Sequence, residues 1–169
     1  GSVVQGMEAG RIPVRVTHND TKINNILFDQ DTGKAVCVID LDTVMPGSML
    51  YDFGDALRIG GSTAAEDEVE LDKVWFDERA FEAFAKGYLS EMREALTEDE
   101  LALLPLSVKL MTYECGIRFL TDYLNGDTYF KIHREHHNLD RARNQFKLVA
   151  DIAGKEGLLA KMVEAALKG

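Results

Sequence analysis

The polar stretch from His18 to Asn25 lies between two apolar segments and carries residue types suited to catalysis. It contains a carboxylate at Asp20, an amine at Lys22 and the amide of Asn25. Polar residues with turn propensity form loops, and loops held by a rigid scaffold commonly present reactive groups. We expect His18 to support this loop through hydrogen bonds rather than to carry protons. The stretch is therefore a candidate reactive loop.

A second group of carboxylates, Asp40 and Asp42, follows the apolar residues 36–39. Residues two positions apart in a strand point to the same side, so the pattern predicts that both carboxylates face one way. Close carboxylates repel each other unless a cation lies between them, and oxygen ligands suit Mg²⁺. The alternative is a strand end at which an aspartate caps a turn or a helix.

The spacing joins both groups into one pattern. Asn25 follows Asp20 by five positions and Asp40 follows Asn25 by fifteen, as in the catalytic loop and metal motif of kinases. In that chemistry Asp20 would orient the attacking hydroxyl and accept its proton. Lys22 would neutralise charge on the transferred phosphoryl group. Asn25 and Asp40 would bind Mg²⁺ and, through it, the phosphates of ATP, with Asp42 as a further metal ligand.

Short strands are expected to hold this loop in place. Runs of β-branched and other apolar residues, separated by turn residues, predict strands. The second and third runs should pair as a hairpin about the turn at 29–34, and Pro46-Gly47 reads as a break after them. The expected strands cover residues 14–16, 25–29 and 35–40.

Helical patterns dominate the rest of the chain. Asp77 is a suitable N-cap for a first helix. Thr97 and Glu100 have the form of a capping box that opens a long helix, and Asn125-Gly126 stops it. The expected helices cover residues 77–96, 97–124, 138–153 and 155–168. The sequence thus predicts a single α+β domain over residues 1–169, mostly helical, with a small catalytic-loop β-hairpin.

Three segments of the chain resemble a known family. HNDTKINNILFD (18–29) and VIDLDTVMPGSMLYDFGDALR (38–58) are similar to the C-terminal lobe of the aminoglycoside-phosphotransferase and choline-kinase superfamily. With RFLTDYLNGDTYFK (118–131), they resemble most closely the N-acetylhexosamine 1-kinase branch, whose members phosphorylate the anomeric hydroxyl of N-acetylglucosamine or N-acetylgalactosamine. The resemblance implies the C-terminal (large) lobe of a protein-kinase-like fold, ATP as phosphoryl donor, Mg²⁺ as cofactor and a small-molecule sugar substrate.

The resemblance also implies roles for residues outside the loop. Asp52 would hold the catalytic loop, or would instead cap the helix that begins near it. Arg118 and Tyr129 would bind the sugar, the first through its hydrogen-bond donors and the second through its ring and phenol. As alternatives, Arg118 would pair with Asp122 four residues later, and Tyr129 would belong to the core.

No part of the chain resembles the half of a kinase that covers ATP. The sequence has no G-x-G-x-x-G loop, and only 19 residues precede Asp20. We therefore expect the N-terminal nucleotide-binding lobe to be absent from this chain and to act as its partner. The isolated chain is expected to be inactive.

Other functions fit parts of the sequence. A haloacid-dehalogenase-type phosphatase would use Asp40 as nucleophile and Asp42 as acid, but that fold needs further βα units. A non-catalytic sugar- or partner-binding module is a second alternative. A choline or aminoglycoside kinase is a third. Arg118 would repel a quaternary ammonium, and the loop lacks the glycine that often separates His from Asp in aminoglycoside kinases.

The composition argues against several classes of protein. With 46% hydrophobic residues the chain should be globular, and its formal net charge of −10 argues against binding nucleic acid. No apolar run approaches the roughly 20 residues of a membrane span, so no membrane partner is expected. Cys37 and Cys115 are interpreted as buried thiols in a reducing compartment, which predicts a cytoplasmic protein.

Overall fold

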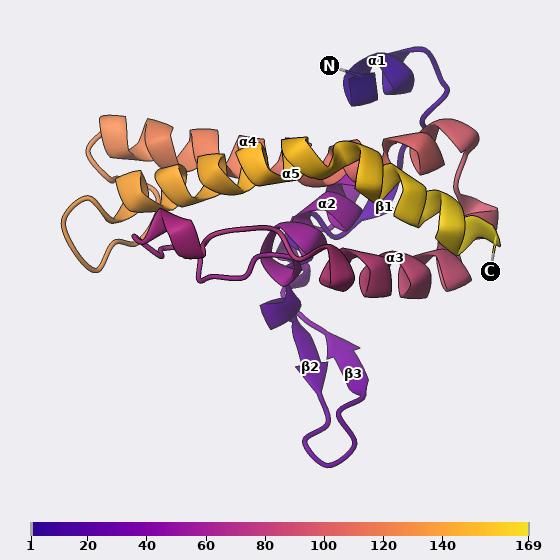
Figure 1. The fold of residues 1–169 in the computed structure, drawn as a ribbon, viewed down its shortest axis with the longest axis horizontal. Helices are drawn as coiled ribbons and strands as arrows, with labels where there is room; N and C mark the ends of the chain where they lie inside the picture. The colour runs from indigo at the N-terminus through magenta and orange to yellow at the C-terminus, as the bar shows by residue number, and fades with distance from the viewer. Residues whose placement is uncertain (1, 169) are drawn as a thin grey trace.

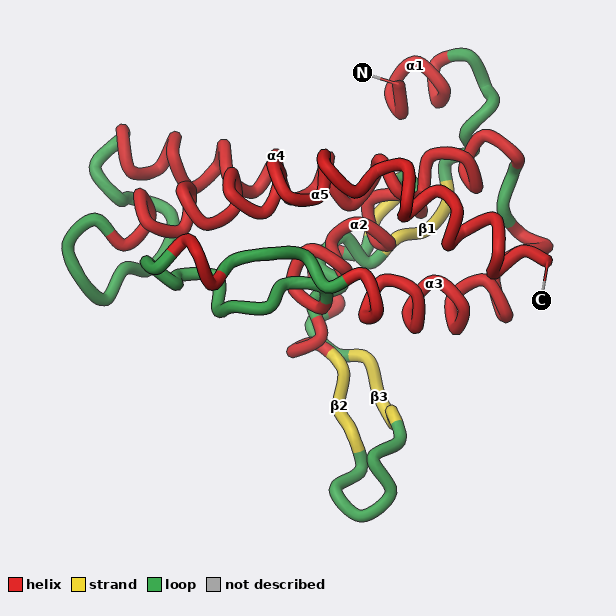
Figure 2. Tube along the Cα trace, viewed as in Figure 1, coloured by secondary structure: helices red, strands yellow, loops and turns green. Residues whose placement is uncertain are grey.

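The computed structural model describes residues 2–168, and most of them are helical (Figure 2). The α-helices are α1 (Ser2–Glu8), α2 (Met49–Gly60), α3 (Glu78–Met92), α4 (Glu98–Leu124) and α5 (His137–Lys168). The strands are β1 (Arg15–Thr17), β2 (Ile26–Phe28), β3 (Ala35–Val38) and β4 (Met45–Gly47). The predicted α+β class with a mostly helical chain and a small hairpin is confirmed.

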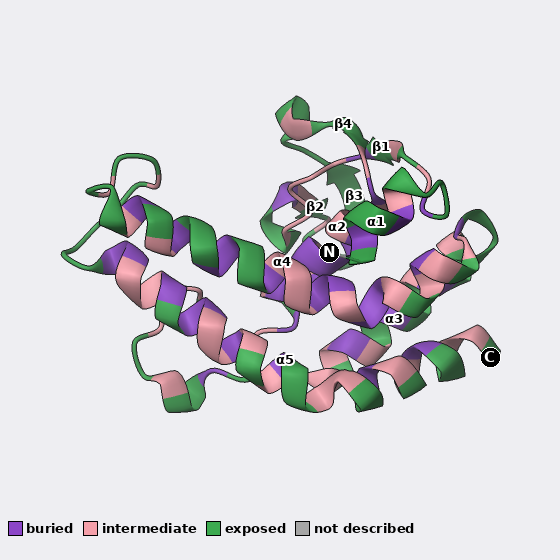
Figure 3. Cartoon of the chain, turned by 90° about the horizontal axis from the view of Figure 1, so that it is seen from above, coloured by how far each residue is buried: buried purple, intermediate pink, exposed green. Residues whose placement is uncertain are grey.

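Helices α4 and α5 form the long axis of the molecule. They lie side by side and run in opposite directions, while α2 packs on α4 and α3 packs on α5 (Figure 1). The buried faces of these helices point toward one another (Figure 3). The core between them contains Phe53, Leu57, Phe81, Leu104, Leu148 and Ile152. None of the helices within residues 2–168 is long and apolar enough to cross a membrane.

The strands form two separate antiparallel pairs. The predicted hairpin is confirmed: β2 pairs with β3, with Leu27 opposite Cys37, and the hairpin projects away from the helices (Figure 1). All of β3 is exposed, so the prediction of a buried thiol is wrong for Cys37, although it is confirmed for Cys115. No parallel sheet occurs within residues 2–168, which removes the support for the phosphatase alternative.

The second pair corrects the interpretation of Pro46-Gly47 as a break. Both residues belong to β4, which pairs with β1 and sets Pro46 opposite Val16. A proline lacks the amide hydrogen that a central strand needs, but a strand with one neighbour tolerates it. At Gly47 a side chain would clash with the hydroxyl of Thr17. The glycine therefore lets β4 approach the strand that leads into the polar loop.

The prediction that Asp40 and Asp42 share one side of a strand is wrong. Strand β3 ends at Val38. Asp40 has a φ of 64°, in the left-handed region, which aspartate tolerates better than most residues. A 3₁₀ turn over Leu41–Thr43 follows and contains Asp42. The chain leaves the hairpin here because it must turn back toward β4.

Two helix boundaries test the capping predictions. The side chain of Asp77 accepts a hydrogen bond from the backbone of Arg79 and caps α3. Thr97 and Glu100 form the complete capping box that begins α4. Both predictions are confirmed. Such caps can be predicted from sequence because they depend on residues only two or three positions apart.

Helix α5 differs from the sequence-based expectation of two helices. It runs unbroken over 32 residues and includes Gly154, where a break was expected. The intrinsic cost of a glycine in a helix is about 1 kcal/mol. Packing of α5 against both α4 and α3 outweighs that cost.

Candidate active site

Asp52, in the first turn of α2, anchors the beginning of the polar loop. Its Oδ2 accepts a hydrogen bond from the backbone N–H of His18 at 2.8 Å, and its Oδ1 accepts one from Asn19 at 2.8 Å. The hydroxyl of Thr21 donates to the carbonyl of Asp52 at 2.6 Å. The N-cap of α2 is Ser48. Of the two roles considered for Asp52, the structure therefore shows the loop anchor, and the helix-cap alternative is wrong.

The imidazole of His18 connects the loop to the end of the hairpin. Its Nδ1 accepts a hydrogen bond from the backbone N–H of Asp20 at 3.3 Å, and its Nε2 lies 3.0 Å from the carbonyl oxygen of Ile39. A ring that accepts at Nδ1 carries its proton on Nε2, so Nε2 donates to Ile39. Both ring nitrogens are therefore occupied by structural hydrogen bonds, as the expected supporting role requires.

Asn19 is a loop residue whose part the sequence did not reveal. It has a φ of 62°, and asparagine is among the residues that occur most often in this left-handed region. Its Nδ2 donates to the carbonyl of Thr43 at 3.0 Å, and the hydroxyl of Thr43 donates to the carbonyl of His18 at 2.7 Å. These bonds join the loop to the turn that carries Asp42.

The carboxylate of Asp20 is held by two neighbours within the loop. Lys22 Nζ and Asn25 Nδ2 each lie 2.8 Å from Asp20 Oδ2. Burial alone would raise the pKa of Asp20, but the hydrogen bonds from Lys22 and Asn25 outweigh burial and lower it. Asp20 is therefore ionised at neutral pH. Its Oδ1 accepts no hydrogen bond from the residues that the structure describes.

Two of the predicted metal ligands, Asn25 and Asp40, are connected through the backbone of Ile39. Asn25 is 5% exposed, and its carbonyl accepts a hydrogen bond from the backbone of Ile39 at 2.9 Å, which brings Asp40 beside the loop. Asp40 and Asp42 are both exposed. Within residues 2–168 no three His, Cys, Asp or Glu side chains cluster as a metal site. The oxygens of Asn25 and Asp40 are nevertheless donors that a hard cation such as Mg²⁺ accepts.

Arg118 and Tyr129 meet at the far end of α4. The guanidinium carbon of Arg118 lies 5.7 Å from the ring centre of Tyr129, and both residues line a cavity of about 420 Å³. Arg118 Nε lies 3.7 Å from Glu114 Oε1, so Asp122 is not its partner as the alternative supposed. Tyr129 is 74% exposed, so the alternative that places it in the core is wrong.

Asp122 instead organises the turn that carries Tyr129. Its Oδ1 accepts hydrogen bonds from the backbone of Thr128 at 2.9 Å and of Tyr129 at 2.8 Å. Its Oδ2 accepts from the backbone of Phe130 and from the side chain of Asn138, both at 2.9 Å. Burial would raise the pKa of Asp122, but the backbone N–H groups outweigh it and lower the pKa. This anchoring role of Asp122 was not predicted from the sequence.

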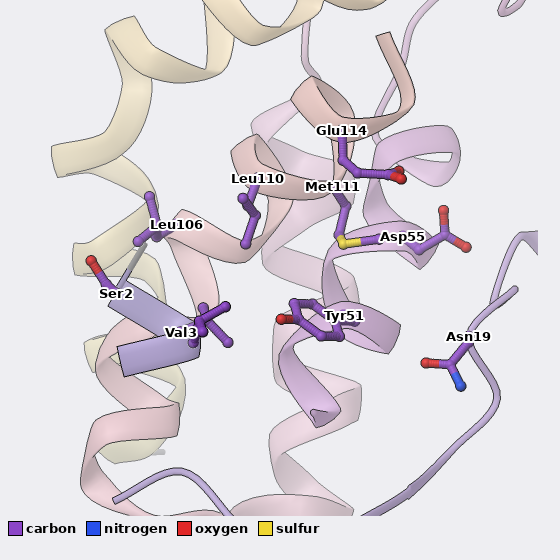
Figure 4. A pocket seen from close by; sticks show the side chains of 10 residues that line it. Ser2, Val3, Asn19, Tyr51, Asp55, Leu106, Leu110, Met111 and Glu114 are labelled. Atoms are coloured by element: carbon purple, nitrogen blue, oxygen red, sulfur yellow. The ribbon is translucent and has the colours of Figure 1, made fainter. Parts of the chain in front are cut away.

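A larger cavity, of about 540 Å³, lies between α1, α2 and α4 and reaches the polar loop at Asn19 (Figure 4). Asp55 from α2 and Glu114 from α4 also line it. Neither residue was singled out from the sequence, because the cavity exists only once α1 and α4 pack around α2. Glu114 pairs with Arg118, so the two cavities are neighbours along α4.

A comparison with protein-family models adds an independent finding. Residues 7–100 match the model of the phosphotransferase enzyme family, APH. The matched segment is 94 of the 169 residues, which is more than half of the chain. It includes the whole polar loop together with Asp40, Asp42 and Asp52, whereas Arg118 and Tyr129 lie outside it.

Proposed function

Since this chain belongs to the phosphotransferase enzyme family, we propose that it transfers the γ-phosphoryl group of ATP to a hydroxyl of a small molecule. The observation that carries the proposal is the environment of Asp20. Lys22 and Asn25 hold one of its oxygens at 2.8 Å, and Asp52 fixes the loop from α2. A fixed carboxylate beside metal ligands is the arrangement that phosphoryl transfer uses.

In this proposal Asp20 is the catalytic base. The acceptor hydroxyl oxygen forms a bond to the γ-phosphorus, the bond from that phosphorus to the bridging oxygen breaks, and ADP leaves. Oδ1 of Asp20 receives the hydroxyl proton. The lowered pKa of Asp20 keeps it ready to accept that proton at neutral pH. Lys22, which lies 2.8 Å from Asp20 Oδ2, would stabilise negative charge on the transferred group.

Asn25 and Asp40 are the proposed ligands of Mg²⁺, and Asp42 is a further ligand. The hydrogen bond between the backbones of Ile39 and Asn25 keeps the first two at one edge of the loop. When bound, the metal would neutralise charge on the phosphates of ATP.

For the acceptor we propose an N-acetylhexosamine, phosphorylated at its anomeric hydroxyl. Arg118 and Tyr129 support this choice, because one offers hydrogen-bond donors and the other an exposed ring for a sugar face. Their contact at 5.7 Å brings both groups to one cavity. An arginine there disfavours choline, whose quaternary ammonium would be repelled.

We also propose that the nucleotide-covering lobe is contributed by polypeptide outside these residues. The side chains of Val16, Val36 and Leu41 are 75%, 64% and 60% exposed on the strands and turn that flank the loop. These exposed apolar side chains are the surface that we propose the lobe covers. The chain by itself should therefore turn over below about 1 s⁻¹, the low end for kinases, in an ADP-release assay.

The assignment of Asp20 can be tested in the polypeptide that includes the nucleotide-binding lobe. Asp20→Asn should retain nucleotide binding and lower kcat by about 10²–10⁴-fold, the usual contribution of a positioned base. Asp40→Asn should instead weaken Mg²⁺-dependent binding of ATP. Asp31→Asn, at the exposed tip of the hairpin, is the matched control and should change neither. Full activity in both of the first two variants would overturn the proposal.

The acceptor can be tested by competition among substrates. The protein should phosphorylate N-acetylglucosamine faster than choline or an aminoglycoside. Arg118→Ala should raise the KM for the sugar far more than the KM for ATP. An unchanged sugar KM in this variant, or a preference for choline, would contradict the proposed acceptor and leave the phosphotransferase assignment intact.

A further inference from the structure

The cavity between α1, α2 and α4 opens beside the proposed catalytic base. Asn19, one of its wall residues, is the immediate neighbour of Asp20 in the chain. Its volume of about 540 Å³ falls within the range of small-molecule binding sites. A molecule bound here would therefore have one end beside the loop backbone that carries Asp20.

The wall of this cavity has two chemically different parts. Val3, Leu106 and Leu110 supply apolar surface from α1 and α4, and they lie on one side in Figure 4. Asp55 and Glu114 supply carboxylates on the other side of the same view, toward Asn19. The polar part thus faces the catalytic loop and the apolar part faces away from it.

The carboxylates in the polar part already have cationic partners. Asp55 Oδ1 accepts a hydrogen bond from Arg58 Nε at 3.0 Å within the core, and Glu114 pairs with Arg118. Arg58 also forms an ion pair with Glu66, which does not line the cavity. Because each carboxylate is paired, neither requires a positively charged ligand.

One oxygen of Asp55 has no partner. Oδ2 is buried and forms no hydrogen bond to any residue that the structure describes. A buried polar atom without a partner is uncommon in folded proteins and asks for an explanation, such as a bound molecule that supplies the missing donor. Asp55 lines the cavity, so a rotation of its side chain would present Oδ2 to a hydroxyl or amide N–H of an acceptor.

We infer that this cavity forms the part of the acceptor site next to the polar loop, adjoining the Arg118 and Tyr129 cavity through the Glu114–Arg118 pair. It selects a neutral hydroxyl compound that carries an apolar substituent. This inference rests on the proposed phosphotransferase function and narrows the class of its substrate. The hydroxyls lie toward Asn19 and Asp55, and the substituent packs on Val3, Leu106 and Leu110. A charged amine in place of the substituent would lose its hydration against this apolar surface.

A series of N-acyl glucosamines tests the inference by isothermal titration calorimetry on the 169-residue chain. Glucosamine, N-acetylglucosamine and N-butanoylglucosamine share one sugar and differ in charge and in acyl length. We expect N-butanoylglucosamine to bind about fourfold to fifteenfold more tightly than N-acetylglucosamine, because each fully buried methylene contributes about fourfold. Glucosamine should bind more weakly than either.

Two leucine variants show whether the gain arises in this cavity. Leu106→Gln places a polar group on the apolar wall and should remove the advantage of the butanoyl compound. Leu158→Gln is the matched control, because Leu158 is 44% exposed on α5 and does not line the cavity. This control should retain the full advantage, and thermal melts should confirm that both variants are folded.

Several outcomes would overturn the inference. They are no binding of any of the three sugars, equal affinity for both acyl compounds, tighter binding of glucosamine, or an advantage that survives Leu106→Gln. None of these depends on phosphoryl transfer. If Asp20→Asn abolishes transfer while the binding series fails, the phosphotransferase function stands and the location and selectivity of the acceptor site are wrong.

Discussion

Asp52 and Asp122 each anchor a loop, but the loops lie at different distances along the chain from their anchors. Each is a carboxylate on a helix that collects backbone N–H groups from a loop. Asp52 binds the N–H groups of residues 33 and 34 positions away. Asp122 binds those of residues 6 to 8 positions away. The first loop is therefore fixed by tertiary packing, and the second by a local turn.

This difference predicts how the two loops respond to damage. The loop at His18 keeps its shape only while α2 is docked beneath it. The turn at Tyr129 is tied to the end of its own helix and to Asn138 at the start of α5. Loosening of the packing around α2 should therefore disturb the polar loop while leaving the turn at Tyr129 ordered.

The largest effect is expected from Asp52→Ala. This change removes both acceptors of the loop N–H groups, and a misplacement of about 1 Å can cost about 10²-fold in rate. We expect phosphoryl transfer, measured together with the nucleotide-binding lobe, to fall by at least about 10²-fold. Hydrogen exchange at His18 and Asn19 should accelerate, while exchange at Tyr129 stays slow. Slow exchange at both loop amides would show that Asp52 is not their anchor.

A smaller effect is expected from Asp122→Ala, and at the other loop. Hydrogen exchange should accelerate at Thr128, Tyr129 and Phe130, while His18 and Asn19 remain protected. Because Tyr129 contributes to the proposed acceptor site, the sugar KM should rise about tenfold or less, with kcat nearly unchanged. Asp122→Asn is a useful second variant. Its amide group places an N–H donor opposite backbone N–H groups, which are also donors, so this change should release the turn as well. A fall in kcat without a rise in the sugar KM in Asp122→Ala would contradict the assignment of this turn to acceptor binding.

The smallest effect is the response of the distal turn to acid. The folded-state pKa of Asp122 is lowered by its backbone hydrogen bonds. A group of this kind stabilises the fold above its unfolded pKa of about 3.9, and the contribution is lost as the pH falls through the folded value. Thermal melts from pH 5 downward should therefore show a decline in stability that is partly absent in Asp122→Asn. Parallel curves for both proteins would exclude this contribution.

The parts of the fold that the sequence predicts well depend on neighbours in the chain. Thr97 and Glu100 form reciprocal capping hydrogen bonds across three positions. The hairpin follows from two apolar runs on either side of one turn. The polar loop was recognisable for the same reason, because Asp20, Lys22 and Asn25 lie within six positions and meet in the structure.

The parts that escaped prediction depend on distant packing. Nothing near Gly154 indicates that α4 and α3 hold α5 straight. Arg118 lies one helical turn from both Glu114 and Asp122, so the sequence spacing allows an ion pair with either. Asp122 instead accepts hydrogen bonds from the following loop, and Arg118 pairs with Glu114. Asp55 became a candidate only when α1 and α4 enclosed a cavity around it.

The antiparallel pairing of α4 and α5 also bears on the order in which the molecule folds. Only residues 125–136 separate these two helices, so their contacts close a short loop and should form early. Strands β1 and β4 pair Thr17 with Met45, and α2 must then find α4 across about fifty positions. The helical pair can thus assemble before the reactive loop has its shape. The proposed catalytic geometry is therefore expected to form late in folding. A chain arrested halfway would be compact and helical but would lack the arrangement that we propose for phosphoryl transfer.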